Sequence, residues 1–180
     1  MPGMTDPHDG LVSFQEAYSA GLIDLDAGIL DPDLYVHMDT ANGEPRMTYV
    51  RIKKGIITAF VVFARADPVE GLNCFQVGVA VPKEYRNRGL AKETMEAAIC
   101  DLAAGFGDRG LPPFYVEAIV GIDNEPSKRV SIAVLSKEPT PVTDRISGQP
   151  ALQFLRKVET TGKVDRPRKG KTVRKVKTSK

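Results

Sequence analysis

The 180-residue sequence contains no tryptophan, two histidines and two cysteines. Cys74 and Cys100 both lie in hydrophobic patterns, which favours buried free thiols over a disulfide and fits a reducing compartment. No cluster of residues has metal-ligand spacing, and no motif supports Ser/His/Asp or Cys/His catalysis. We therefore expect no metal centre, and we interpret His37 as a satisfied or exposed histidine.

Long apolar runs are missing as well. No window approaches the roughly 18 continuous apolar residues of a membrane-spanning helix. The first residues, MPGMTDPHDG, have neither the basic region nor the apolar core of a signal peptide. We therefore expect a cytoplasmic protein that does not contact membranes. Because these first ten residues or so are rich in proline, glycine and aspartate, we predict that they are disordered.

The charges are unevenly distributed along the chain. Lys163–Lys180 carries nine basic residues and one acid, which leaves 16 basic and 22 acidic residues in Met1–Gly162. We predict one domain over residues 1–162 and a basic, disordered tail over residues 163–180. Such a tail attracts polyanions, and without aromatic residues it would bind them with little sequence preference. Contact with nucleic acid or ribosomes is one interpretation of the tail, and a solubilising role is the other.

The hydrophobic pattern predicts an α+β, or mixed α/β, fold in which helices pack on a sheet. Apolar residues at helical spacing within 11–23 predict the first helix, with Ser13 as its N-cap and Glu16 completing a capping box. The 136–150 segment, with three prolines, is predicted to be a loop. The other expected elements are strands at 34–40, 46–52, 56–67, 74–82, 114–122 and 151–159, and helices from about 90 and 126.

One strand-to-helix corner carries chemistry of its own. In PKEYRNRGLAKETM, Arg86, Arg88 and Gly89 lie between the central apolar strand and an amphipathic helix. A helix N-terminus offers unpaired N–H groups and a partial positive charge to an anion. Glycine lets a phosphate approach the backbone, and guanidinium groups match its geometry. The corner therefore indicates a pyrophosphate site, although an ordinary helix start with solvated arginines would have the same sequence pattern.

The corner resembles the (Gln/Arg)-x-x-Gly-x-(Gly/Ala) signature of the GNAT family, the Gcn5-related N-acetyltransferases, across Arg86–Ala91. A second match follows in VEAIVGIDNEPSKRV, where a strand precedes Asn-x-x-(Ala/Ser), here Asn124 and Ser127. The resemblance covers about Met47–Leu135 and implies a central mixed, mostly antiparallel sheet flanked by helices. It also implies acetyl-CoA as cosubstrate.

By this resemblance, one set of residues would bind the cofactor. The backbone of Val79–Val81 would pair with the pantetheine arm, and the amides of Arg86–Ala91 would hold the pyrophosphate. Asn124 and Ser127 would lie near the pantetheine, although Asn124 also reads as a plain N-cap. The expected set is Val79, Ala80, Val81, Arg86, Asn87, Arg88, Gly89, Leu90, Ala91, Asn124 and Ser127.

The catalytic groups are less clear, because two residues that the family often uses are missing. The place of a tyrosine acid falls near Ser131, and the central strand has Cys74 and Gln76 where a glutamate is common. Ser131 could relay a proton through water, and Gln76 could orient a water or the substrate. Glu117 is a candidate base or an ordinary strand-surface charge.

The resemblance implies an N-acetyltransferase in which an amine attacks the thioester directly in a ternary complex. The alternative is a catalytically degenerate module on the same fold that binds acyl-CoA or nucleic acid. The missing tyrosine and glutamate favour this alternative, whereas the intact corner favours the enzyme. Family members are often homodimers, but the sequence carries no interface signal and does not identify the acceptor.

Overall fold

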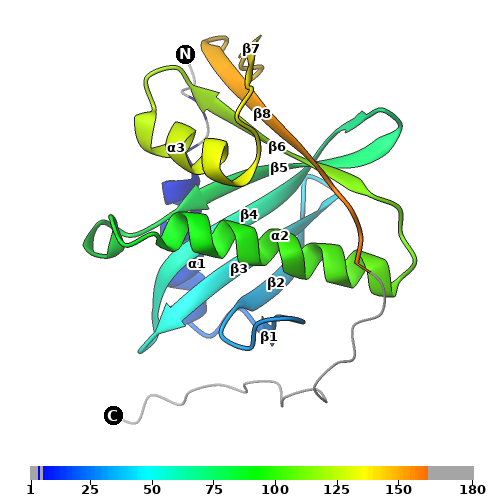
Figure 1. The fold of residues 1–180 in the computed structure, drawn as a ribbon. Coiled ribbons are helices and arrows are strands. Elements are labelled where there is room, and N and C mark those ends of the chain that lie inside the picture. The colour runs from blue at the N-terminus through cyan, green and yellow to red at the C-terminus, as the bar shows by residue number, and fades with distance from the viewer. Residues whose placement is uncertain (1–3, 5, 162–180) are drawn as a thin grey trace, which may run out of the picture.

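Eight strands form one sheet in the order β1-β2-β3-β4-β5-β6-β8-β7 (Figure 1). The structure is a computed structural model that describes residues 4 and 6–161, so the basic tail lies outside it. Neighbouring strands are antiparallel except β5 and β6, which are parallel. This confirms the predicted mixed, mostly antiparallel sheet. The strands are β1 (Asp26–Ala27), β2 (Tyr35–Ala41), β3 (Glu44–Lys53), β4 (Ile56–Val69), β5 (Leu72–Ala80), β6 (Phe114–Gly121), β7 (Thr140–Thr143) and β8 (Pro150–Val158).

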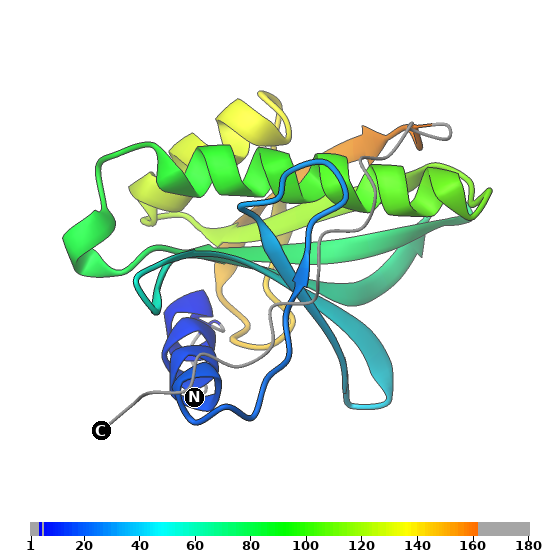
Figure 2. The ribbon, with the colours of Figure 1, turned by 90° about the horizontal axis from the view of Figure 1, so that it is seen from below.

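Helices cover both faces of the sheet. Figure 2 shows α2 (Leu90–Asp108) and α3 (Glu125–Val134) on one side and α1 (Pro7–Ser19) on the other. The two faces follow from the alternation of side chains along each strand. We call them the α2 face and the α1 face. Among the described residues, no helix combines the length and hydrophobicity that crossing a bilayer requires.

Helix α1 begins earlier than the sequence analysis predicts. Its N-cap is Asp6, whose side chain accepts a hydrogen bond from the backbone N–H of His8, and Pro7 follows in the first turn. The Asp-Pro pair is itself a strong start signal, because proline is preorganised for the first helical position. The expected start at Ser13 is therefore wrong, and so is the expectation of disorder from Pro7 onward.

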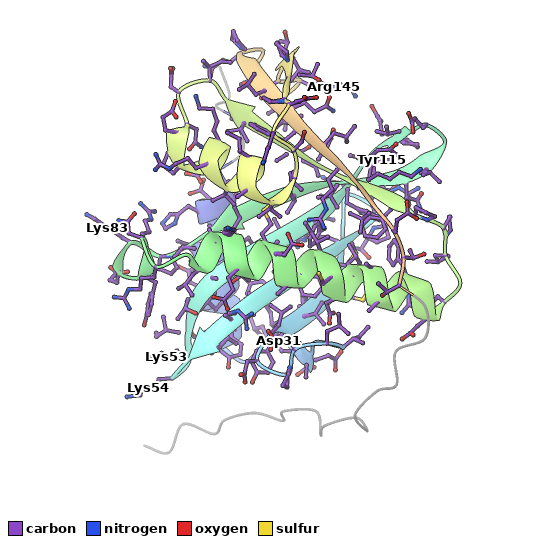
Figure 3. All side chains as sticks on the ribbon, in the orientation of Figure 1. Asp31, Lys53, Lys54, Lys83, Tyr115 and Arg145 are labelled. Atoms are coloured by element: carbon purple, nitrogen blue, oxygen red, sulfur yellow. The ribbon has the colours of Figure 1, made fainter. Side chains whose placement is uncertain are left out.

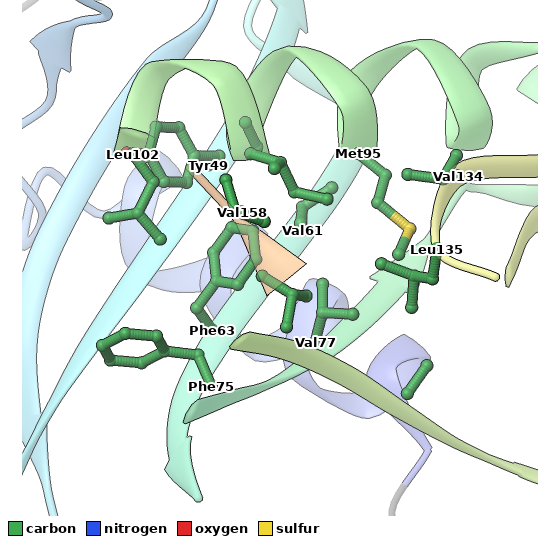
Figure 4. Close-up of a cluster of buried hydrophobic side chains, with 14 of the residues drawn as sticks. Tyr49, Val61, Phe63, Phe75, Val77, Met95, Leu102, Val134, Leu135 and Val158 are labelled. Carbon is green, nitrogen blue, oxygen red and sulfur yellow. The ribbon is translucent and has the colours of Figure 1, made fainter. Parts of the chain in front are cut away.

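The main hydrophobic core lies between the sheet and helices α2 and α3. Figure 4 shows Phe63, Phe75 and Val77 of the sheet packed with Met95 of α2 and Leu135, just after α3. A second, smaller cluster joins Leu11 of α1 to the opposite face of β3, β4 and β5. Helix α2 is therefore fixed along its length by the larger core, which also sets the position of its N-terminus.

The amphipathic pattern predicted for α2 is present, but one of the two cysteines is not buried as expected. Met95, Ala98, Ile99 and Leu102 are buried against the sheet. Cys74 is buried and free as expected, whereas Cys100 is free but exposed. The prediction of burial is wrong for Cys100, because position 100 falls on the solvent side of a helix whose buried side is set by the residues next to it.

The segment predicted as a loop contains the edge strand β7, which pairs with β8 from Thr140↔Gln153 to Thr143↔Pro150. Pro139 precedes this strand and Pro141 lies within it, and both interrupt the usual strand signal. An edge strand tolerates proline because one side of its backbone has no partner strand. The loop assignment is therefore correct for the β7–β8 connection and wrong for β7 itself.

Candidate active site

Strands β5 and β6 pair over a short stretch and then diverge. Their register partners are Cys74↔Tyr115, Phe75↔Val116 and Gln76↔Glu117, and no pair follows. Beyond this point β5 continues to pair with β4 as far as Phe60↔Ala80, and β6 with β8 as far as Gly121↔Ala151. Each strand therefore turns an edge without a partner strand toward the gap between them. Val79 and Ala80, expected to meet the pantetheine arm, lie on this part of β5, and Val81 follows.

The corner between β5 and α2 has the backbone that an anion site requires. After a short 3₁₀ turn, Lys83–Tyr85, the chain passes through Asn87 with φ 60° and Gly89 with φ 75°. Both values lie in the left-handed region, where asparagine and glycine are the tolerated residues. Gly89 is the N-cap of α2 and no side chain caps this end, so the first helical N–H groups keep their capacity to bind.

The two arginines of the motif are anchored to their own loop. Nε of Arg86 donates to the carbonyl of Val81 at 3.0 Å, and Nη2 of Arg88 donates to the carbonyl of Glu84 at 3.0 Å. The Arg88 guanidinium also lies 5.6 Å from the centre of the Tyr85 ring. Neither arginine forms an ion pair within residues 6–161. Their charge is therefore both held in place and available.

The second motif forms the start of α3. Asn124 is the N-cap of this helix, and its Oδ1 accepts a hydrogen bond from the N–H of Ser127 at 3.2 Å. The N-cap interpretation of Asn124 is thus what the structure shows for its side chain. Since α3 follows β6 directly, this cap lies at the open end of the gap between β5 and β6, where Ser127 is partly buried.

The three candidate catalytic residues are not gathered together. Gln76 and Glu117 are register partners on the α1 face, because their neighbours Phe75, Val77 and Val116 face the core. Ser131 is buried on α3, on the other side of the sheet, with 4% of its surface exposed. A molecule lying in the gap between β5 and β6 would therefore have Ser131 on one side and Gln76 and Glu117 on the other.

The α1 face is bare at its centre. Gln76 is exposed although β5 is an inner strand, and so is its register partner Ala64. Helix α1 ends this bare area on one side, where Pro7 packs against Gly78: a Cβ on Gly78 would lie 3.0 Å from Cγ of Pro7. Met4 similarly lies against Gly121 of β6. The N-terminal residues thus contact both diverging strands.

Polar side chains surround this bare area. Glu117 is partly buried and accepts a hydrogen bond from Nε2 of Gln153 at 2.6 Å. Arg145, in the β7–β8 connection, pairs with Asp67, and its guanidinium pKa is raised by Asp67 first and also by Glu117. The Tyr115 hydroxyl donates to Glu70. No local sequence pattern indicates Arg145, Gln153 or the pair of Tyr115 with Glu70, because only strand pairing brings such distant residues together.

Cys74 lies under this polar area and is not a nucleophile at neutral pH. Burial, followed by the nearby negative charge of Glu117, raises the pKa of its thiol to about 12. The thiolate, which is the reactive form, is therefore scarce. Within residues 6–161, no group of three or more His, Cys, Asp or Glu side chains is arranged to hold a metal ion.

Comparison with known proteins gives a family and several structural likenesses. The model of the acetyltransferase (GNAT) family matches residues 14–130. No curated protein matches the sequence. A GNAT-family acetyltransferase from Streptococcus pneumoniae is 15% identical, with a TM-score of 0.47, over 63% of this chain and 66% of that one.

Two further solved structures are similar to this chain at comparable sequence identity and TM-score. RimJ from Mycobacterium smegmatis, in complex with CoA-disulfide, is 16% identical with a TM-score of 0.49, over 64% of this chain and 54% of that one. A GNAT-family acetyltransferase from Bacillus anthracis is 20% identical with a TM-score of 0.44, over 64% and 66%. The chain thus covers 54–66% of the length of these three proteins.

Proposed function

The chain belongs to the acetyltransferase (GNAT) family, and from this premise we propose that it transfers an acetyl group from acetyl-CoA to an amine. One observation carries the proposal. The gap where β5 and β6 diverge adjoins an uncapped helix N-terminus with a left-handed glycine. Strand edges can pair with an amide-bearing chain, and the helix start can hold its phosphates.

The residues at the corner fit acetyl-CoA as the donor. A Cβ built on Gly89 would meet nothing within 4 Å, so the space beside this residue at the start of α2 is open. The N–H groups of Arg86–Ala91 would hold the pyrophosphate, with Arg86 and Arg88 adding charge. The edge of Val79–Val81 would hold the amides of the pantetheine arm, near Asn124 and Ser127. The donor supplies the activated thioester carbonyl.

The acceptor amine would approach from the α1 face, where Gln76 is exposed beside Glu117. Its nitrogen attacks the carbonyl carbon, and the C–S bond breaks as the new C–N bond forms. A backbone N–H on the edge of β5 can stabilise the developing oxyanion. The attacking nitrogen becomes positively charged, and Glu117 takes its proton directly or through a water. Gln76 orients the amine or that water. Holding both reactants in one complex supplies much of the rate.

The departing thiolate needs a proton from the other side of the sheet. Ser131 lies on the α2 face, and we propose that it relays this proton through water from solvent. A serine hydroxyl is a poor acid, so this relay contributes less than the base at Glu117. Cys74 takes no part, because its thiol is protonated at neutral pH.

Turnover of acetyl-CoA with pools of amines tests the proposal. Free CoA should be released with at least one pool of small amines, peptides or nucleobase amines. Tight CoA binding without release from any pool would favour the alternative, a catalytically inactive acyl-CoA-binding or nucleic-acid-binding module. Two observations keep that alternative in view: Gln76 cannot act as a base, and α3 contains no tyrosine.

The basic tail adds a proposal about location. Its nine positive charges within Lys163–Lys180 would bring a cytoplasmic enzyme to nucleic acid or ribosomes. Retention on nucleic acid should fall steeply with salt for the whole chain and much less for a chain that ends at Gly162. Equal salt dependence of the two would remove the tail from this role.

A further inference from the structure

A hollow of about 450 Å³ lies between the β3–β4 turn and the loop that precedes α2. It is separate from the gap between β5 and β6, and only Arg88 belongs both to it and to the glycine motif. Figure 3 shows Lys53, Lys54 and Lys83 at the same end of the molecule. The hollow is lined by Lys53, Lys54, Ile56, Glu84, Tyr85 and Arg88.

The charge of this hollow is opposite to that of the domain around it. It has three cationic side chains and one carboxylate, whereas residues 1–162 hold 16 basic and 22 acidic residues. No ion pair within residues 6–161 involves Lys53, Lys54, Glu84 or Arg88. The lysines therefore present charge without a protein partner among the described residues, as an anion site requires.

The lysine turn has an unusual backbone for its residue type. Lys53 pairs with Ile56, so Lys54 and Gly55 form a two-residue turn with φ of 51° and 79°. Such turns favour asparagine, aspartate or glycine at the first position, because other residues are strained there. Gln15 of α1 braces the turn by donating to the Gly55 carbonyl at 3.1 Å and accepting from the Ile57 N–H at 2.7 Å. Lys54 is thus held at the hollow at a conformational cost.

The remaining walls suit a flat ring. Tyr85 is partly buried, and Arg88 lies over its ring. Ile56, on the hairpin, is 47% exposed and offers an apolar surface. Aromatic rings and guanidinium planes both stack on nucleobases. The hollow therefore combines a stacking surface with two lysines that suit a phosphate.

We propose that this hollow binds a purine nucleoside that carries a phosphomonoester, with Lys53 and Lys54 on the phosphate and Tyr85, Arg88 and Ile56 against the base. The inference rests on the proposed function, because the donor acetyl-CoA carries a 3′-phosphate on its adenosine. With the pyrophosphate at the start of α2, Arg88 links the two sites. The β3–β4 turn, outside the family motif, then makes the protein selective for CoA over dephospho-CoA.

Binding of CoA and dephospho-CoA to the full chain and to a Lys53→Gln/Lys54→Gln variant tests the proposal. The wild type should bind CoA on the order of tenfold more tightly, the size of a charge-assisted hydrogen bond. The variant should lose this preference while its affinity for dephospho-CoA stays the same. The matched control is Lys137→Gln/Lys157→Gln, which removes two exposed lysines elsewhere and should bind both ligands as the wild type does.

The outcomes separate this inference from the proposed function. Equal wild-type affinity for the two ligands would overturn the inference, and so would an equal loss for both ligands in the variant. Either result leaves acetyl-CoA turnover, and hence the proposed function, intact. If neither CoA form binds, the proposed function fails. The affinities of the protein for adenosine 3′,5′-bisphosphate and for AMP then test whether the hollow binds a nucleoside phosphomonoester. Preference for the bisphosphate that disappears in the variant supports it, and no preference overturns it.

Discussion

On its α2 face the sheet is covered by one continuous core, whereas its α1 face has a small cluster beside an exposed polar centre. The groups proposed to bind the donor lie where the large core fixes them, because the start of α2 and the edge of β5 belong to packed backbone. The groups proposed to meet the acceptor are side chains on the bare face, held by single hydrogen bonds such as that from Gln153 to Glu117. In the proposed function, the donor therefore depends on backbone geometry and the acceptor on side chains.

The largest effect should come from blocking the donor side. Gly89→Glu places a side chain and a negative charge at the helix start and strains a left-handed position, so CoA affinity should fall on the order of 1,000-fold or more. Titration calorimetry measures this change. The matched control is Gly110→Glu, which makes the same substitution at φ 68° beyond the other end of α2. Unchanged CoA affinity in Gly89→Glu would mean that the pyrophosphate binds elsewhere.

The next effect separates the acceptor side from the donor side. Glu117→Gln keeps an acceptor oxygen for Gln153 but cannot take a proton, so kcat should fall on the order of 100-fold. CoA affinity should stay within about twofold, because the donor groups are untouched. Steady-state turnover and CoA titration measure the two. A variant with wild-type kcat would reduce Glu117 to an ordinary strand-surface charge.

A third prediction concerns how the α1 face is covered. Gly78→Val would bring side-chain atoms against Pro7 and Val62, which already lie 3.0 and 3.3 Å from a Cβ at this position. The free energy of unfolding should fall by about 1–3 kcal/mol, as for other overpacked sites. Chemical denaturation measures it, with Ala64→Val on the exposed part of the same face as control. Equal free energies of unfolding for the Gly78→Val and Ala64→Val variants would show that α1 can shift away from Gly78 without loss of stability.

The smallest effect concerns Asp101 on α2, which is buried and accepts hydrogen bonds from the N–H groups of Ile29 and Leu30. Burial, the largest influence, raises the pKa of its carboxyl above the ordinary value of 3.8. The folded state then keeps the proton to higher pH than the unfolded chain. The contribution of Asp101 to stability is complete below pH 3.8 and is lost as pH rises through the folded pKa.

Asp101→Asn removes this dependence and can still accept from both N–H groups. The unfolding free energy of the wild type, relative to that of the variant, should therefore fall as pH rises from about 4 and then level off. Urea titrations over a pH series measure it. Two curves that stay parallel would show that this carboxyl has the same pKa in both states.

Local signals allowed much of the fold to be predicted from the sequence. The apolar run of β5 and the amphipathic pattern of α2 are examples, because each pattern is carried by residues that are close together in the sequence. The predictions were wrong where signals were weakened or in conflict. Strand β7 was missed because of its prolines, and α1 begins at the Asp6-Pro7 signal and not at the capping box of Ser13.

The candidate site also has a part that local sequence predicts and a part that it does not. The corner is a short local motif, so it could be predicted. The hydrogen bond between Glu117 and Gln153 and the pair between Tyr115 and Glu70 join residues 36 and 45 positions apart. Such contacts depend on the strand order β5-β6-β8, which no local pattern specifies. The lysine hollow was missed for the same reason, because it joins a hairpin turn to a distant loop.

The short pairing between β5 and β6 has a consequence for hydrogen exchange. Three register pairs join the two parts of the sheet, and beyond Gln76 strand β5 has a partner on one side alone. Alternate backbone amides of Val77–Ala80 should therefore exchange slowly where they face β4 and rapidly where they face β6. A ligand that fills the gap would slow the second set and leave the first unchanged, which gives a residue-by-residue readout of binding that needs no turnover.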